Sequence, residues 1–237
     1  MARVLILLAR RGHAVQETLP VIDELKRLGI DVALGTESGG DVLFDPVCSW
    51  MAIGEIAWSP SWRLLRDARR SGVFANVERP GGSIAEWVTR FDAIVIPGGH
   101  GEVFGTFVRS ATVTAAIHAF AAAHKPVGLV CHAVAAASFR GPFGEEPLGA
   151  GREVTCWPRA MERMLGALPV IGPYFVPFGT YAQDMVETVT SRVRCSLLPW
   201  RMPLAMVDHD LVTAWGPWSG PAFARALAGR LEVGTRG

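Results

Sequence analysis

The chain has 237 residues, of which 50% are hydrophobic, so it can bury one sizeable core and we expect a single domain over residues 1–237. Its 23 basic and 22 acidic residues leave a net charge of +1, which excludes the strongly basic surface typical of proteins that bind nucleic acid or anionic membranes. Small molecules or protein surfaces are the expected partners.

The start of the chain predicts a buried strand and not a membrane anchor. The apolar run at 3–9 is far too short to cross a bilayer, and no signal-peptide cleavage site follows it. The four cysteines (Cys48, Cys131, Cys156 and Cys195) include no C-x-x-C pair, which favours neither a zinc ribbon nor a disulfide framework. This cysteine usage fits a reducing cytoplasm.

Short apolar runs alternate with helical segments through the first half of the chain. Each run ends in small or turn-forming residues, which predicts buried parallel strands. These runs lie at 3–9, 31–36, 92–99 and 126–131. Segments 21–29 and 111–124 have the spacing of helices, and Gly29 ends the first one. The alternation predicts an α/β fold of the flavodoxin-like, doubly wound kind, with a mostly parallel sheet and helices on both faces.

Two later regions depart from that alternation. Residues 46–90 contain several tryptophans, a helical RLLRDARR stretch and an RPGGS turn, which we interpret as a small cap inserted over one end of the sheet. Residues 204–215 predict two strands around a tight turn. Residues 221–232 predict a closing amphipathic helix with Pro221 in its first turn.

Cys131 lies at the end of a predicted strand, which is where ligands bind in open α/β sheets. A sharp strand-to-helix turn holds such a residue out from the sheet, as in nucleophile elbows built on serine, and the helix N-terminus favours the thiolate. The alternative is a buried small hydrophobe, the usual state of a free cysteine. Three other segments favour the reactive interpretation.

These segments supply candidate partners for Cys131. In IPGGHG the glycines let the backbone approach a ligand, so the amide of Gly99 could join that of His132 in an oxyanion hole, unless the segment is an ordinary turn. Glu17 opens the helix after the first strand and could reach the same crevice, although a glutamate there is more often solvated. Glu162 could orient His132 or be a surface charge on a helix.

Taken together, the blocks resemble a known superfamily. DAIVIPGGHG, then a spacer, then PVGLVCHAVA is similar to the ThiJ/PfpI superfamily, the cysteine-dependent relatives of class I glutamine amidotransferases. Three further blocks look like the branch that holds glutathione-independent glyoxalases and heat-shock chaperone-like proteins. They are HAVQETLPVIDELKRLGIDVALGTESGG, PLGAGREVTCW and VDHDLVTAWGPWSGPAFARAL. The resemblance covers nearly the whole chain.

The resemblance implies roles for individual residues. It makes Cys131 the nucleophile, His132 its paired histidine and Glu162 the acidic member of a triad. Glu17 falls on the glutamate that contacts the cysteine sulfur and moves protons, and Gly99 and His132 fall on the backbone oxyanion donors. It also implies covalent chemistry on a carbonyl or a related electrophilic carbon with no cofactor and no metal, and a homodimer.

The implied reaction is glyoxalase-like: a thiolate adds to a 2-oxoaldehyde, a proton moves between adjacent carbons, and water releases a 2-hydroxy acid. The sequence departs from the glyoxalase branch at CHAV, where a glycine and a proline usually follow the histidine. Trp157 and the later tryptophans favour a larger, flatter substrate, as for a hydratase or lyase, unless they pack the core. His100, which follows the glycine pair, and Trp157 are expected to bind the substrate.

The same fold also fits a protein that is not an enzyme. A holding chaperone or a redox sensor would use Cys131 as an oxidisable thiol and not as a catalyst. Suppression of client aggregation that survives the loss of Cys131, without turnover of a small molecule, would favour this second class of function.

Overall fold

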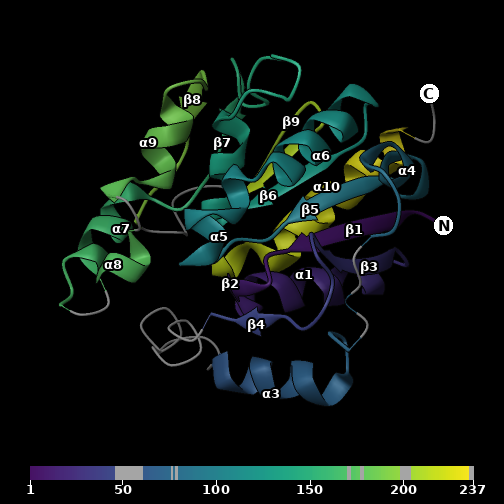
Figure 1. The fold of residues 1–237 in the computed structure, drawn as a ribbon, viewed down its shortest axis with the longest axis horizontal. Coiled ribbons are helices and arrows are strands. Elements are labelled where there is room, and N and C mark those ends of the chain that lie inside the picture. Colours follow the sequence, from purple (N-terminus) through teal and green to yellow (C-terminus); the bar gives the residue numbers. More distant parts are fainter. Residues whose placement is uncertain are drawn as a thin grey trace.

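A six-stranded sheet crosses the protein in the order β3-β1-β5-β6-β10-β9 (Figure 1). The structure is a computed structural model and describes residues 1–45, 61–75, 77, 80–169, 172–176, 179–197 and 204–234. In chain order the six strands are β1 (Arg3–Leu8), β3 (Asp31–Thr36), β5 (Ala93–Ile96), β6 (Val127–Val130), β9 (Ala205–Asp208) and β10 (Leu211–Ala214). Neighbouring strands are parallel except β9 and β10, which are antiparallel.

This strand order confirms the predicted fold class. The first four strands of the sheet stand in the spatial order second, first, third, fourth, as in flavodoxin-like folds. Every residue of β5 and β6 is buried, which accounts for their continuous apolar sequences. Because parallel neighbours need crossover connections, the chain leaves the sheet between them and forms helices.

Helices pack on both faces of the sheet. Those that cover it are α1 (Val15–Arg27), α4 (Ile84–Arg90), α6 (Ala111–Ala122) and α10 (Gly220–Gly234). α1 packs against α10, and α4 packs against α6. In β1, Ile6 joins the buried cluster of α1 and α10, whereas Leu5 and Leu7 join that of α4 and α6. Successive strand residues point to opposite faces, so the two helix pairs cover opposite sides of the sheet.

The remaining elements surround this core. Those outside the central sheet and its two helix pairs are β2 (Arg11–His13), β4 (Leu43–Phe44), α3 (Ser61–Ser71), α5 (Glu102–Gly105), η2 (Phe107–Arg109), η3 (Cys131–Ser138), β7 (Glu153–Val154), α7 (Arg159–Gly166), α8 (Gly172–Phe175), α9 (Ala182–Glu187), β8 (Arg192–Val193) and η6 (Pro217–Ser219). β2 pairs with β4, and β7 pairs with β8. No helix in the described ranges is by itself long and apolar enough to cross a membrane, although the bent pair Glu102–Arg109 and Ala111–Ala122 passes by length and composition.

The predicted elements are present, some with different boundaries. The strand predicted at 31–36 is β3 without a shift, and the two predicted C-terminal strands are β9 and β10. The helix predicted at 21–29 starts earlier, at Val15. The chain is fixed just before this point, because the Ala14 amide donates a hydrogen bond to the Gly98 carbonyl at 3.0 Å. α1 therefore begins beside the end of β5.

The segment from Cys131 onward differs from an ordinary α-helix. Residues 131–138 form a 3₁₀ helix, η3, in which seven of eight residues are buried. A 3₁₀ helix is tighter than an α-helix, so this alanine-rich segment fits inside the core, where α9, α5 and η2 contact it.

The predicted cap at 46–90 is described only in part, because residues 46–60 lie outside the described ranges. α3, from the middle of this region, packs along α1 (Figure 1), where Ala68 joins a small buried cluster with Val15 and Leu19. α4 ends the region and belongs to the helix layer of the sheet. A cap over the strand ends stays a prediction for residues 46–60.

Candidate active site

Cys131 occupies the sharp turn between β6 and η3. Its φ is +58°, in the left-handed region that residues other than glycine seldom adopt. Such a conformation costs about 1–3 kcal/mol and persists only where the surroundings fix it. The residue is 1% exposed. The turn places the Cys131 side chain just beyond the carboxyl end of a central strand, where the sequence predicts it.

Cys131, His132 and Glu162 lie in a row, which we call the triad. The Sγ of Cys131 is 3.4 Å from Nδ1 of His132, and Nε2 of the same ring is 3.2 Å from Oε1 of Glu162. The second contact is at ion-pair distance without the alignment of a hydrogen bond. The Ala182 amide donates to Oε1 of Glu162 at 3.3 Å and so holds the carboxylate between α7 and α9. His132 and Glu162 are 0% and 1% exposed, so the contact between them is shielded from solvent.

Glu17 approaches Cys131 from the first turn of α1. The carboxyl is 2% exposed, and burial raises its pKa to about 7, against the opposing effects of a hydrogen bond with Cys131 and the charge of His132. Gly98 makes the approach possible, because a Cβ there would lie 2.5 Å from Oε2 of Glu17 and 2.8 Å from Cβ of Cys131. Among the described residues, Oε2 of Glu17 has no hydrogen-bond partner. Near neutral pH this carboxyl can both give and take a proton.

Gly99 is held in an antiparallel bridge with His13. The two hydrogen bonds of this bridge, at 3.0 and 3.1 Å, are made by the residues on either side, so the N–H groups of Gly99 and His13 point away from each other. The φ of Gly99 is +148°, and a Cβ there would collide with the Gly12 carbonyl. The position therefore requires glycine. The amide of His132 belongs to the first turn of η3, where N–H groups have no partner within the helix. Both predicted oxyanion donors are thus at neighbouring strand ends.

His100 and Asp45 form a buried pair beside the triad. Nδ1 of His100 is 2.9 Å from Oδ2 of Asp45, and the His100 and His132 rings lie 4.6 Å apart between centroids. Burial lowers the pKa of His100, which favours the neutral ring. The sequence predicts His100 at this site but carries no signal for Asp45, because a single aspartate after a two-residue strand shows no pattern.

His13 is another buried histidine at this edge that sequence reasoning missed. Its Nδ1 lies 3.2 Å from the hydroxyl of Thr18, its ring is 4.7 Å from that of Phe44, and burial lowers its pKa to about 3. The ring is therefore neutral and supports the bridge to Gly99. Despite these histidines and carboxylates, the described part of the chain contains no group of three or more His, Cys, Asp or Glu residues placed to hold a metal ion.

Trp157 and Cys131 both lie next to Gly216. A Cβ on Gly216 would be 2.9 Å from the Trp157 ring and 3.8 Å from Sγ of Cys131. The indole is 6% exposed, and its Nε1 has no hydrogen-bond partner among the residues that the structure describes. Trp215 is different: it is fully buried and donates from Nε1 to the Ser196 carbonyl at 2.9 Å, so it packs the core. Of these two tryptophans, Trp157 is the one whose ring lies next to Gly216, near the thiol.

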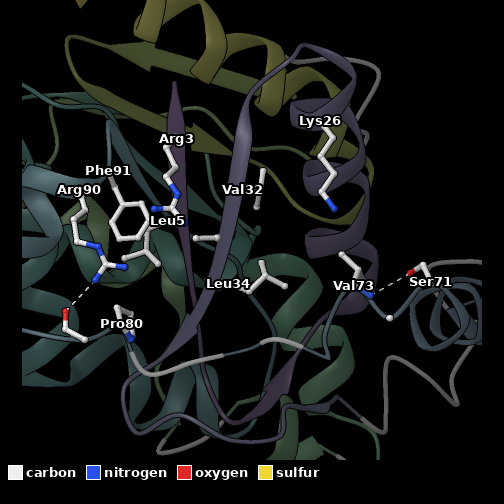
Figure 2. A pocket seen from close by; sticks show the side chains of 13 residues that line it. Arg3, Leu5, Lys26, Val32, Leu34, Ser71, Val73, Pro80, Arg90 and Phe91 are labelled. Atoms are coloured by element: carbon white, nitrogen blue, oxygen red, sulfur yellow. Dashed lines mark hydrogen bonds between the residues drawn. The ribbon is translucent and has the colours of Figure 1, made fainter. Parts of the chain in front are cut away.

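A separate hollow of about 430 Å³ lies at the other end of the sheet. Figure 2 shows Arg3, Lys26 and Arg90 around it, with Phe91 and Leu34. Arg3 begins β1, whereas Cys131 follows the end of β6, and the strands between them are parallel. The hollow is therefore far from the predicted site, and none of its lining residues is a predicted site residue.

Comparison with known proteins gives one family. Residues 79–230 match the family model described as the DJ-1/PfpI family. No curated protein matches the chain in sequence. The Rapid Encystment Protein 24 KDa of Francisella tularensis has 20% identity and a TM-score of 0.71, over 98% of this chain and 99% of that one. Glyoxalase III of Candida albicans has 18% identity and a TM-score of 0.73, over 96% and 97% of the chains.

A third solved structure, DJ-1beta of Drosophila melanogaster, has 18% identity and a TM-score of 0.57, over 97% of this chain and 90% of that one. At these identities the likeness to solved structures shows the fold alone. The family match covers more than half of the chain and includes Gly99, Cys131 and Glu162. The protein therefore belongs to the DJ-1/PfpI family.

Proposed function

We propose that the protein is a cofactor-free, cysteine-dependent enzyme with glyoxalase-like activity, which converts a 2-oxoaldehyde and water into a 2-hydroxy acid. The observation that carries this proposal is the carboxyl of Glu17, buried against Cys131 with a pKa of about 7. A carboxyl with that pKa is suited to proton transfer at neutral pH. The glyoxalase III of Candida albicans has the same fold at 18% identity, and its name supports the reaction type.

In the first step the Cys131 thiolate adds to the aldehyde carbon. A carbon–sulfur bond forms, and the electron pair of the carbonyl bond moves to oxygen, giving a hemithioacetal oxyanion. The N–H groups of Gly99 and His132 donate to this oxygen. Glu17 is neutral at this stage, so its hydrogen bond with Cys131 stabilises the thiolate without a second negative charge nearby.

The second step moves a proton between the two carbons. Glu17 gives its proton to the oxyanion and, now ionised, removes the proton from the former aldehyde carbon. It then delivers that proton to the adjacent carbon, while His132, held by Glu162, transfers the hydroxyl proton between the two oxygens. The result is a thioester of Cys131 with a 2-hydroxy acid. Water hydrolyses this thioester, which releases the acid and the Cys131 thiol, and the thiol proton returns to Glu17.

Trp157 supplies the wall for the substituent of the substrate. Its ring is a flat apolar surface beside Cys131, and its buried Nε1–H lacks a partner among the described residues. Leaving a buried donor unpaired costs about 1–3 kcal/mol, which an acceptor on the substrate would recover. This favours a 2-oxoaldehyde with a flat substituent over the smallest one, and it is also compatible with a hydratase or lyase that acts on a bulkier metabolite through the same thiol.

Turnover of methylglyoxal and phenylglyoxal tests the proposal. The wild type is expected to form lactate and mandelate without added glutathione, with the higher kcat/KM for phenylglyoxal. Cys131→Ala is expected to abolish both activities, whereas Cys195→Ser, which changes a thiol outside the triad, keeps them. Unchanged turnover in Cys131→Ala, or no 2-hydroxy acid from either substrate with the wild type, would contradict the proposal.

A further inference from the structure

Two cysteines outside the triad lie opposite each other on neighbouring strands. β7 and β8 are parallel, with Val154 opposite Val193. The Arg194 amide donates to the Val154 carbonyl at 2.8 Å, so the two segments remain paired beyond the last residues of β7 and β8. Continuing the register by two residues places Cys156 opposite Cys195. Adjacent strands are about 4.8 Å apart, which lies within the range of roughly 4.4–6.8 Å that Cα atoms of a disulfide span.

The surroundings of the two thiols differ. Both are free, Cys156 is fully buried, and Cys195 is partly exposed. A hydrogen bond between them lowers the pKa of Cys195 and raises the pKa of Cys156. Cys195 is thus the thiol that ionises first and that a dissolved oxidant can reach.

We propose that Cys156 and Cys195 form a reversible disulfide when a hydroperoxide oxidises the protein, as a redox site distinct from Cys131. The inference does not rest on the proposed function. The Cys195 thiolate attacks the terminal oxygen of the hydroperoxide, so that a sulfur–oxygen bond forms, the oxygen–oxygen bond breaks, and an alcohol or water leaves after protonation. Cys195 is then a sulfenic acid.

The second half of the reaction closes the pair. Cys156 loses its thiol proton and attacks the sulfenic sulfur of Cys195, so that the sulfur–sulfur bond forms, the sulfur–oxygen bond breaks, and water leaves. Together the two thiols give up two electrons, which the hydroperoxide accepts. A dithiol reductant restores both thiols by two exchange steps and becomes a disulfide itself.

The pair lies next to the candidate active site. Cys156 directly precedes Trp157, and Ser196, which follows Cys195, accepts the hydrogen bond from Trp215. The rings of Trp157 and Trp215 are 5.0 Å apart. The disulfide would therefore join the two segments behind these indoles, while the thiol of Cys131 takes no part.

Peptide mapping tests the proposal on the full-length protein. The reduced protein is treated with hydrogen peroxide, its remaining thiols are alkylated under denaturing conditions, and it is digested with trypsin without reduction. Cleavage at arginine gives peptides 153–159 and 195–201, each with one cysteine. The expected result is one linked product of these two peptides, lighter than their sum by two hydrogens and lost on treatment with dithiothreitol, while alkylated Cys156 and Cys195 fall in equal amounts.

Three variants separate this disulfide from other oxidation. Cys131→Ala is expected to form the linked product to the same extent, since the nucleophile is not used. Cys156→Ser and Cys195→Ser are expected to lose it, and Cys156→Ser should leave Cys195 as a sulfenic acid that a dimedone probe labels. A major link from either residue to Cys48 or Cys131 would overturn the proposal. So would free thiols at both positions at a peroxide dose that has already oxidised Cys131.

Discussion

Cys131 and Cys195 are both thiols beyond the end of a strand, yet their neighbours differ in kind. Cys131 meets the carboxyl of Glu17, with a pKa of about 7, whereas Cys195 meets the thiol of Cys156. A carboxyl exchanges protons and is not oxidised, while a second thiol supplies the other half of a disulfide. We therefore expect acid–base chemistry at Cys131 and redox chemistry at Cys195.

The largest effect is expected from removing the carboxyl of Glu17. Glu17→Gln keeps a hydrogen-bond donor beside Cys131 but cannot move protons, so kcat/KM for phenylglyoxal is expected to fall by about 10²–10⁴-fold. In the wild type, kcat/KM is expected to decline as pH rises through about 7, because the neutral carboxyl is lost. That decline should be absent in the variant. Asp23→Asn, an exposed change on the same helix, is the control, and equal rates for the two variants would contradict the role of Glu17.

The raised pKa of Glu17 also predicts how the free energy of unfolding depends on pH. Burial raises the pKa of Glu17 from 4.5 to about 7, so between these values the folded protein holds a proton that the unfolded chain has lost. This contribution is fully favourable below pH 4.5 and is lost as pH rises through 7, by about 2.5 kcal/mol between pH 5 and 8. Urea unfolding at both pH values should show this fall in the wild type and a smaller one in Glu17→Gln. Identical falls in both proteins would show that burial does not perturb this group.

Gly98, beside the thiol, and Gly81, at the other end of the sheet, are expected to respond differently to substitution by alanine. A Cβ on Gly98 would meet Glu17 and also lie 2.6 Å from the Val130 carbonyl, so Gly98→Ala is expected to destabilise the protein by about 1–3 kcal/mol and to lower kcat. At Gly81, beside the separate hollow, an added Cβ meets nothing within 4 Å. Gly81→Ala should therefore stay within about 0.5 kcal/mol of the wild type in denaturant unfolding. Equal losses in the two variants would argue against a packed site at Gly98.

The smallest expected effect concerns the thiol pair. Cys156→Ala removes the hydrogen bond that lowers the pKa of Cys195, so alkylation of Cys195 at neutral pH should slow by a few-fold. The rate is measured by mass spectrometry after timed exposure to iodoacetamide. Cys131→Ala should leave this rate unchanged, and a slowing of the same size in that control would indicate a general change in the fold.

The strands and the elbow could be predicted because each depends on a local pattern. The apolar run that ends at Cys131 identifies both a buried strand and the residue just beyond it. Glu162 and Glu17 required the family resemblance, since a lone glutamate on a helix has no chemical signature of its own. The structure then brings Glu17 to the thiol of Cys131 and Glu162 to the ring of His132.

Pairings between distant segments could not be predicted from the sequence. Asp45 and His100 are 55 positions apart, and only the folded chain brings them to hydrogen-bond distance. Cys156 and Cys195 are likewise joined by the register of β7 and β8. The 3₁₀ form of η3 was missed for another reason: alanine favours an α-helix, and packing inside the core overrides that preference.

Residues 133–137, which follow Cys131 in η3, also limit how this protein could acquire a new substrate. Ala133 and Ala137 at its two ends are 0% exposed, as are the residues between them, so any larger side chain there would displace the core. Gly216 and Trp157 also lie near the sulfur. Selection or engineering for a different substrate would therefore act through Trp157 and its neighbours, while the backbone that holds Cys131 stays as it is.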